Sequence, residues 1–274
     1  MRVELPTKVN GSAMYGIDIQ VPGMLYGTVL RAPVEGSVPD KIDDAKAKAV
    51  AGVTAVIRLP HGVGVVAQTA WAAFAGRQAL IGSVTWTRTG VAWGFDSDKG
   101  HDAFAADARN LRQPARDWSA QGNVRGEIEK AASVVEAEYR CDYAYHAQME
   151  PLNAVASVSP SGDSVEIWAG TQSQTTATEA PAKLLGIPRD KVKLHDLLMG
   201  GGFGRRGNRD VDFIVDAVML SKEVGKPVKA MWTREDDVHN GRFRPLSAHY
   251  LRAGFDASGK LAAWQHRVAA DRIT

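Results

Sequence analysis

The sequence predicts an α+β fold in which two mixed α/β domains flank a weakly patterned segment. From residue 16 to 86, short apolar strands alternate with helical stretches. Residues 89–131 show no sustained hydrophobic period and contain scattered glycines and a proline, which is typical of a linker. A second alternation of strands and helices begins at residue 132. We therefore expect domains at 1–88 and 132–274, joined by the linker.

The elements of the first domain follow from hydrophobic periodicity and from residues that start or stop helices. Asp43 and Asp44 precede a run rich in Ala and Lys, and Gly52 follows it, which is the order expected around a helix. We expect helices at 39–50 and 71–80, and strands at 27–32, 53–59, 63–67 and 84–87.

The second domain carries the clearest helical signal of the chain, at residues 210–224. Phe213, Ile214 and Ala217 lie on one apolar face, and Gly225 closes the helix. We expect a further helix at 175–185 and strands at 134–139, 165–169, 192–198, 228–232, 249–255 and 261–269. The chain stops about five residues after the last strand, and we interpret this ending as a cut.

Composition indicates an ordinary globular protein of 274 residues, with 45% hydrophobic and 23% charged residues. A net charge of +2 does not favour a nucleic-acid partner. The densest basic cluster is Arg205, Arg206 and Arg209, which we expect to be solvated surface or to make local anion contacts. Residues 1–15 carry no targeting signal, and no stretch approaches the length of a transmembrane helix. We expect a soluble protein, cytoplasmic or periplasmic.

The single cysteine, Cys141, excludes an internal disulfide framework and any multi-cysteine zinc or iron–sulfur site in this chain. His146 and Glu150 stand four residues apart and would pair on a metal if they were helical, with Cys141 as a third ligand. Pro151 disfavours a helix there, so a buried, hydrogen-bonded role for His146 and Glu150 is favoured. Asp236 and Asp237 are adjacent, which favours a helix cap or a surface turn over a paired acid–base site.

A glycine-rich segment, Met199-Gly-Gly-Gly-Phe-Gly204, lies between a predicted strand and a predicted helix. Consecutive peptide N–H groups in such a loop form a concavity that binds phosphate or another anionic cofactor group. The alternative is a turn that lets two elements pack closely. A P-loop would need Lys-Ser/Thr where Arg205-Arg206 stand, and a dinucleotide fingerprint would need separated glycines. Both nucleotide folds therefore fit poorly.

Three further segments accompany this loop. They are His146-Ala-Gln-Met-Glu-Pro151, then Thr171-Gln172 upstream of the predicted helix at 175–185 and its terminating Gly186-Ile-Pro188, and Trp232-Thr-Arg-Glu-Asp-Asp237 followed by Gly241-Arg-Phe-Arg-Pro245. Together with the loop they resemble the molybdopterin-binding large subunit of the molybdenum hydroxylases, the xanthine dehydrogenase and aldehyde oxidase family. The resemblance is to the isoquinoline 1-oxidoreductase and aldehyde dehydrogenase branch. In the first domain, Tyr15-Gly-Ile-Asp-Ile-Gln-Val-Pro-Gly-Met-Leu-Tyr26 resembles the α/β hammerhead domain of this family.

The resemblance implies a hammerhead domain at 1–88, followed by the first part of a mixed α/β molybdopterin-binding domain at 132–274. It implies that Gln172 donates a hydrogen bond to an oxo ligand of molybdenum. The implied cofactor-binding residues are Gln172, Gly201, Gly202, Phe203, Gly204 and Arg205. Local sequence alone leaves Gln172 open as a surface glutamine and Phe203 as a core residue. Arg205-Arg206 replace the Gly-Lys of xanthine-dehydrogenase-type members, which favours the isoquinoline and aldehyde branch.

The resemblance further implies hydroxylation of an aldehyde or N-heteroaromatic carbon, with water as the oxygen source. The family's catalytic base is a glutamate in a Gly-x-Gly-Glu segment, which we expect beyond Thr274, so we expect no catalytic residue and no activity in this chain alone. The implied cofactor is molybdopterin cytosine dinucleotide with molybdenum. The implied partners are the remaining half of the subunit and a small [2Fe–2S] subunit. A naturally split enzyme and a noncatalytic scaffold derived from the family are the alternatives.

Overall fold

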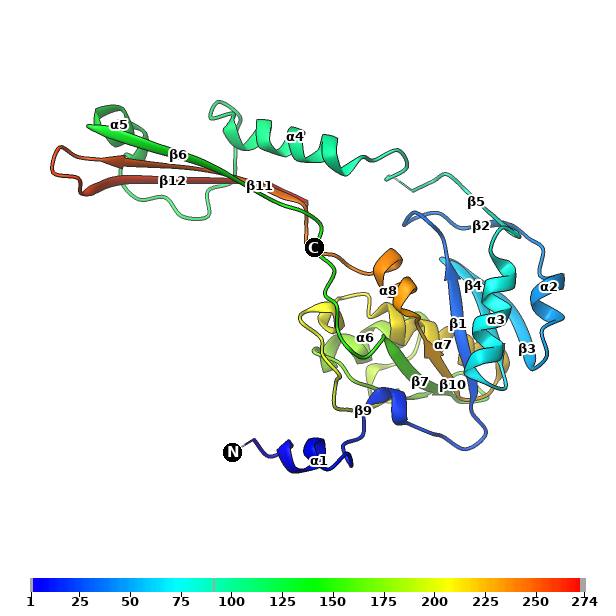
Figure 1. The fold of residues 1–274 in the computed structure, drawn as a ribbon. Helices are drawn as coiled ribbons and strands as arrows, with labels where there is room; N and C mark the ends of the chain where they lie inside the picture. Colours follow the sequence, from blue (N-terminus) through cyan, green and yellow to red (C-terminus); the bar gives the residue numbers. More distant parts are fainter. Residues whose placement is uncertain (1, 91, 272–274) are drawn as a thin grey trace. The chain divides into compact units, whose positions relative to one another are not determined.

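The computed structural model describes residues 2–90 and 92–271 (Figure 1). Contacts divide the chain into two compact units. The first unit comprises Met1–Trp93 and His146–Arg242, and the second comprises Gly94–Tyr145 and Phe243–Thr274. Each unit is therefore assembled from two separate stretches of the sequence.

A seven-stranded mixed sheet forms the centre of the first unit, in the order β3-β4-β1-β10-β7-β8-β9. Two neighbouring pairs, β1–β10 and β8–β9, are parallel and the others are antiparallel. The strands are β1 (Leu25–Arg31), β3 (Val53–Leu59), β4 (Gly62–Ala67), β7 (Asn153–Val158), β8 (Val165–Ala169), β9 (Val192–Asp196) and β10 (Val228–Met231).

The observed division differs from the predicted domains at 1–88 and 132–274, because β1 and β10 pair in parallel across that boundary, with Leu25 opposite Val228. Hydrophobic patterns report local structure and carry no information on which distant strands pair. The predicted linker at 89–131 contains two helices, α4 (Ser97–Arg109) and α5 (Val124–Lys130). Each of these helices buries only one or two apolar residues, and those of α4 are alanines. The hydrophobic period of this part of the sequence is therefore weak.

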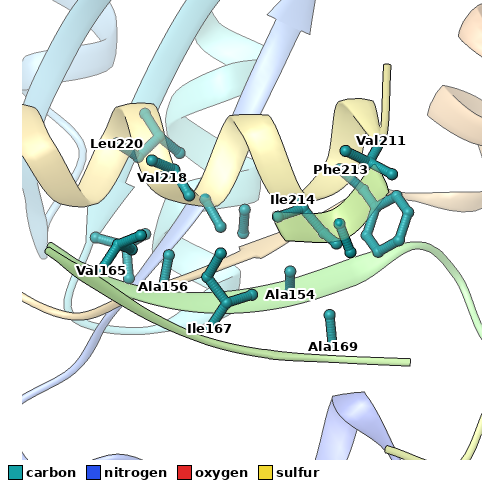
Figure 2. Close-up of a cluster of buried hydrophobic side chains, with 14 of the residues drawn as sticks. Ala154, Ala156, Val165, Ile167, Ala169, Val211, Phe213, Ile214, Val218 and Leu220 are labelled. Atoms are coloured by element: carbon teal, nitrogen blue, oxygen red, sulfur yellow. The ribbon is translucent and has the colours of Figure 1, made fainter. Parts of the chain in front are cut away.

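The core of the first unit lies between the sheet and two helices, α6 (Gln174–Leu185) and α7 (Asp212–Val224). Figure 2 shows Ile214 and Val218 of α7 above the small side chains of Ala154 and Ala156 on β7. Because these β7 residues are alanines, the helix can approach the sheet closely. Burial of each such Ile or Val side chain stabilises the folded state by about 1.5–3 kcal/mol.

The remaining elements of the first unit are short. The predicted helix at 39–50 is corrected to a strand, β2 (Pro39–Ile42), followed by a one-turn helix, α2 (Ala45–Lys48). Residues of β2 pair with β5 (Val84–Trp86), and this pairing overrides the helical pattern. The others are α1 (Leu5–Val9), α3 (Ala70–Leu80), α8 (Arg234–Asn240) and three 3₁₀ turns, at Gly16–Asp18, Arg205–Gly207 and Arg189–Lys191.

The second unit is a three-stranded antiparallel sheet in the order β12-β11-β6, together with α4 and α5. Its strands are β6 (Ser133–Cys141), β11 (Ser247–Phe255) and β12 (Leu261–Ala270). Ala105 and Ala108 of α4 pack with Ala248 and Tyr250 of β11 in a small buried cluster. Within residues 2–90 and 92–271, we find no helix with the length and apolarity needed to cross a membrane.

A first prediction concerns the start of α3. The Thr69 Oγ1 atom accepts a hydrogen bond from the Ala72 peptide N–H at 3.2 Å and so caps the helix. We expect Thr69→Ala to lower the free energy of unfolding by about 1 kcal/mol, whereas Thr69→Ser retains the capping oxygen. Urea denaturation of both variants measures the difference. Equal loss in both would show that the hydroxyl does not stabilise α3.

Candidate functional site

The glycine loop, defined here as residues 199–204, follows β9 and reverses direction through left-handed backbone conformations. Gly201 and Gly204 have φ values of +99° and +108°, which side-chain-bearing residues rarely adopt. Phe203 has φ +52° and a side chain that is 63% exposed. Phe203 is therefore not a core residue, and its positive φ stores backbone strain of the kind that clusters at binding sites.

Gln172 lies beside this loop, in the segment between β8 and α6. Its Oε1 atom accepts hydrogen bonds from the peptide N–H groups of Gly204 at 3.0 Å and Arg206 at 3.3 Å. Because both partners are donors, the amide oxygen must occupy this position and the NH₂ group must point elsewhere. Within the described residues, the Nε2 group has no protein partner. Gln172 therefore presents a donor.

A side chain at position 202 would have to displace the Gln172 amide. A Cβ atom on Gly202 would lie 2.6 Å from Oε1 of Gln172. Position 207, five residues later, differs, because a Cβ there would meet Gln172 at an ordinary 3.5 Å. Glycine at position 202 thus lets the loop and the Gln172 amide pack against each other.

In the glycine loop, the carbonyl groups and the N–H groups of the backbone differ in their hydrogen bonding. The carbonyl oxygens of Gly200, Gly201 and Gly202 all accept hydrogen bonds from neighbouring protein groups. In the described part of the chain, the N–H groups of Gly201, Gly202 and Phe203 donate to no protein acceptor. Together with the Gln172 amide, these groups fit a ligand that carries oxygen acceptors, such as phosphate or oxo groups. The residues present therefore fit an anionic, oxygen-rich cofactor.

A buried ion pair between Arg206 and Glu150 stabilises the glycine loop. Arg206 is fully buried, and its Nη2 atom lies 2.9 Å from Oε2 of Glu150. The same guanidinium donates to the carbonyl oxygens of Gly201 at 3.1 Å and Gly170 at 3.3 Å. Burial lowers the pKa of Arg206 below its ordinary value, against the opposing effect of Glu150. The guanidinium thus connects the loop to the end of β8.

The Glu150 carboxylate receives four hydrogen bonds. Oε2 accepts from Arg206 and from the Gly200 N–H at 2.8 Å, and Oε1 accepts from the Ile17 N–H at 3.1 Å and from Asn153 Nδ2 at 3.0 Å. The expected buried, hydrogen-bonded role of Glu150 is confirmed. No group of three or more metal-ligating side chains occurs among the described residues, so the metal alternative gains no support.

Of the two expectations for Arg205 and Arg206, solvated surface is wrong, because both side chains are almost completely buried, and local anion contacts are confirmed, because each pairs with a carboxylate. The Arg205 guanidinium donates to both carboxylate oxygens of Asp212, at 3.1 and 2.8 Å. Its peptide N–H donates to the Gly202 carbonyl oxygen. Each arginine can be buried because it has its own carboxylate partner, Asp212 for Arg205 and Glu150 for Arg206. A cofactor contact from Arg205 stays a prediction.

The two adjacent aspartates also lie inside the first unit. Asp236 forms a capping box with Thr233 at the start of α8, which confirms the expected cap. The surface alternative is wrong, since Asp236 and Asp237 are both buried. Gln148 Nε2 donates to Asp237, and a Cβ on Gly201 would meet the Gln148 side chain at 3.3 Å. α8 is therefore linked to the glycine loop through Gln148.

Sequence reasoning missed a second buried network around Asp216 of α7. The Asp216 carboxylate is bound by Arg31 at 2.5 Å, His61 at 2.8 Å and the Trp232 indole N–H at 2.9 Å. The available signal was an acidic residue next to Ala217, on the helix face predicted to be apolar. The three partners come from distant parts of the chain, so their identity was not readable from local sequence.

Several known proteins are similar to this chain. Residues 105–272 match the model of the molybdopterin cofactor-binding domain, a match that begins within the predicted linker. The beta subunit of isoquinoline 1-oxidoreductase from Brevundimonas diminuta is 38% identical over 98% of this chain and 35% of its own length. A membrane-bound aldehyde dehydrogenase (pyrroloquinoline-quinone) from Gluconacetobacter polyoxogenes is 35% identical, with 98% and 35% covered. The chain spans about a third of the length of these relatives.

Solved structures show the same fold at low sequence identity. Quinoline 2-oxidoreductase from Pseudomonas putida 86 superposes with a TM-score of 0.76 at 20% identity, covering 98% of this chain and 38% of that one. Reconstituted CO dehydrogenase from Oligotropha carboxidovorans gives a TM-score of 0.77 at 20% identity, covering 99% and 40%. With the family match over residues 105–272, the chain belongs to the molybdopterin cofactor-binding domain family of the molybdenum hydroxylases, as its motifs predict.

Proposed function

We propose that this chain is part of the molybdopterin-binding subunit of an oxidoreductase that hydroxylates an aldehyde or N-heterocyclic carbon, with water supplying the oxygen. The observation that carries the proposal is the set of unpartnered donors at the glycine loop, the N–H groups of Gly201, Gly202 and Phe203 beside the Gln172 amide. The relatives named for isoquinoline and aldehyde oxidation support this substrate class.

The residues of the loop act by binding and orienting. The Gln172 NH₂ group donates to an acceptor oxygen of the cofactor, while its own oxygen is held by the Gly204 and Arg206 N–H groups. The Arg206–Glu150 pair keeps the loop in this conformation. When bound, the molybdenum cofactor supplies the two-electron oxidation of the substrate carbon. The proton acceptor is a glutamate outside residues 1–274.

The cofactor is proposed to be the cytosine dinucleotide form of molybdopterin, and the partners to be the rest of the subunit and a small [2Fe–2S] subunit. Electrons must leave the site after each oxidation. Cys141 is the single cysteine, so an iron–sulfur cluster that accepts these electrons must be held by another polypeptide or another part of the protein.

Substitution of Gln172 tests its role in the complete enzyme. We expect Gln172→Leu to lower kcat about 10–100-fold, because groups that hydrogen-bond the ligands of a metal have effects of this size. Gln174→Leu is the matched control, since Gln174 is exposed and its amide donates to Asp196 at 2.6 Å. Steady-state rates with an aldehyde and an artificial electron acceptor measure both. Equal rates in the two variants would show that Gln172 does not act at the cofactor site.

The reaction itself is tested with isotopically labelled water. The complete enzyme, supplied with isoquinoline or benzaldehyde and an electron acceptor, is expected to place oxygen from labelled water in the product, as read by mass spectrometry. Label derived from dioxygen, or no turnover of either substrate class by a molybdenum-loaded protein, would contradict the proposed function and favour the noncatalytic scaffold.

A further inference from the structure

A cavity separate from the glycine loop lies in the first unit. Its volume is about 470 Å³, and its walls come from β1, α3, β5 and the end of α8. None of its lining residues belongs to the glycine loop, and Gln172 is not among them. Cavities of roughly 300–1,000 Å³ are the usual size for small organic ligands.

The polar part of the wall consists of cationic or neutral groups. Arg31, Arg77, His239 and Asn240 line the cavity, and no carboxylate does so among the described residues. The rest of the wall is largely apolar, and includes Ile81 and the aromatic ring of Trp86. A wall of this composition favours a ligand with an anionic end and an apolar body.

Both arginines are held in place by ion pairs with buried aspartates. Arg31 Nη2 donates to Asp216 at 2.5 Å, and Arg77 Nη2 donates to Asp236. The side chains of Asp216 and Asp236 are only 1% and 3% exposed. The guanidinium groups are thereby held rigidly, so little side-chain entropy is lost when they bind a ligand.

Each guanidinium keeps donors for a ligand. In the described residues, Nη1 of Arg31 and Nη1 of Arg77 donate to no protein acceptor, and neither atom is sealed from solvent.

We propose that this cavity binds a small carboxylic acid with an apolar body. The carboxylate accepts hydrogen bonds from the unused N–H groups of Arg31 and Arg77, and the hydrocarbon part packs against Trp86 and Ile81. Arginine binds carboxylates through charge-assisted hydrogen bonds, which are shorter and stronger than neutral ones. The apolar wall selects against small inorganic anions, which have no surface to bury there.

Calorimetric titration of the complete protein with naphthoate tests the proposal. We expect a Kd below about 1 mM for naphthoate, equivalent to at least about 4 kcal/mol, and binding at least ten times weaker for uncharged naphthamide of the same shape. Equal affinity for the two compounds, or no binding of naphthoate, would overturn the proposal.

A matched pair of variants locates the binding site without breaking either ion pair. Ile81 lines the cavity and is 53% exposed, so substitution there is compatible with folding. Ile81→Asp and Ile81→Asn have nearly the same shape and differ in charge. We expect Ile81→Asp to bind naphthoate at least ten times more weakly than Ile81→Asn, with the same affinity for naphthamide in both. Equal naphthoate affinity in the two variants would place binding elsewhere.

Discussion

Glu150→Gln is expected to lower the free energy of unfolding by about 3–5 kcal/mol, the usual cost of leaving a buried charge without its partner. Arg206 is fully buried and would lose the carboxylate 2.9 Å away. All four groups around the Glu150 carboxylate are donors, so the NH₂ of a glutamine would face N–H groups. Two or more of these hydrogen bonds would be lost.

Glu179→Gln provides the control, because Glu179 also pairs with an arginine but both side chains are more than half exposed. Exposed pairs of this kind contribute about 0–1 kcal/mol. Denaturant titration of the purified protein, followed by tryptophan fluorescence, compares the two variants. A loss below about 1 kcal/mol for Glu150→Gln would show that the pair does not hold the glycine loop.

Asp216→Asn is expected to cost about 3 kcal/mol at neutral pH and to flatten the dependence of stability on acid pH. Burial raises the pKa of Asp216, but Arg31, His61 and Trp232 outweigh this effect and hold the pKa below its ordinary value of 3.8. A carboxyl group whose pKa is depressed by folding stabilises the protein above its unfolded pKa. This contribution is lost as the pH falls through the folded pKa.

The pH window of this second effect therefore lies below about pH 4, the ordinary range of an aspartate. Denaturation midpoints measured between neutral pH and pH 3 are expected to fall less steeply for Asp216→Asn than for the unmodified protein. Asp190→Asn, an exposed aspartate, serves as the control and is expected to leave the acid slope unchanged. Parallel acid slopes for all three proteins would show that Asp216 has no depressed pKa in the folded state.

Local pattern predicted much of the secondary structure but not the pairing of distant segments. The helix at 210–224 was predicted from its apolar face, and the structure places α7 at Asp212–Val224. The parallel pair β1–β10 joins segments that lie far apart in the chain, and hydrophobic period says nothing about such partners. α4 and α5 were missed for a different reason, because their buried residues are few and mostly small and give a weak hydrophobic period.

The glycine loop and the accompanying motifs could be recognised in the sequence because each is a short contiguous segment. The structure brings Gln172 against Gly202 and Gly204, and their contact with a cofactor stays a prediction. An anion contact was one of two expectations for Arg206, but its partner Glu150 was not predicted, since the two residues lie far apart in the chain. Only the tertiary fold shows that a carboxylate from the segment before β7 reaches Arg206.

The cofactor content of two loop variants of the complete protein tests the claim that the glycine loop and Gln172 lie at the cofactor. A Cβ at Gly202 displaces the Gln172 amide, whereas one at Gly207 makes an ordinary contact at 3.5 Å. Molybdenum and cytosine nucleotide are measured after dialysis. We predict that the unmodified protein and Gly207→Ala retain both and that Gly202→Ala loses most of each. Equal content in all three proteins, or none in the unmodified protein, would contradict the claim.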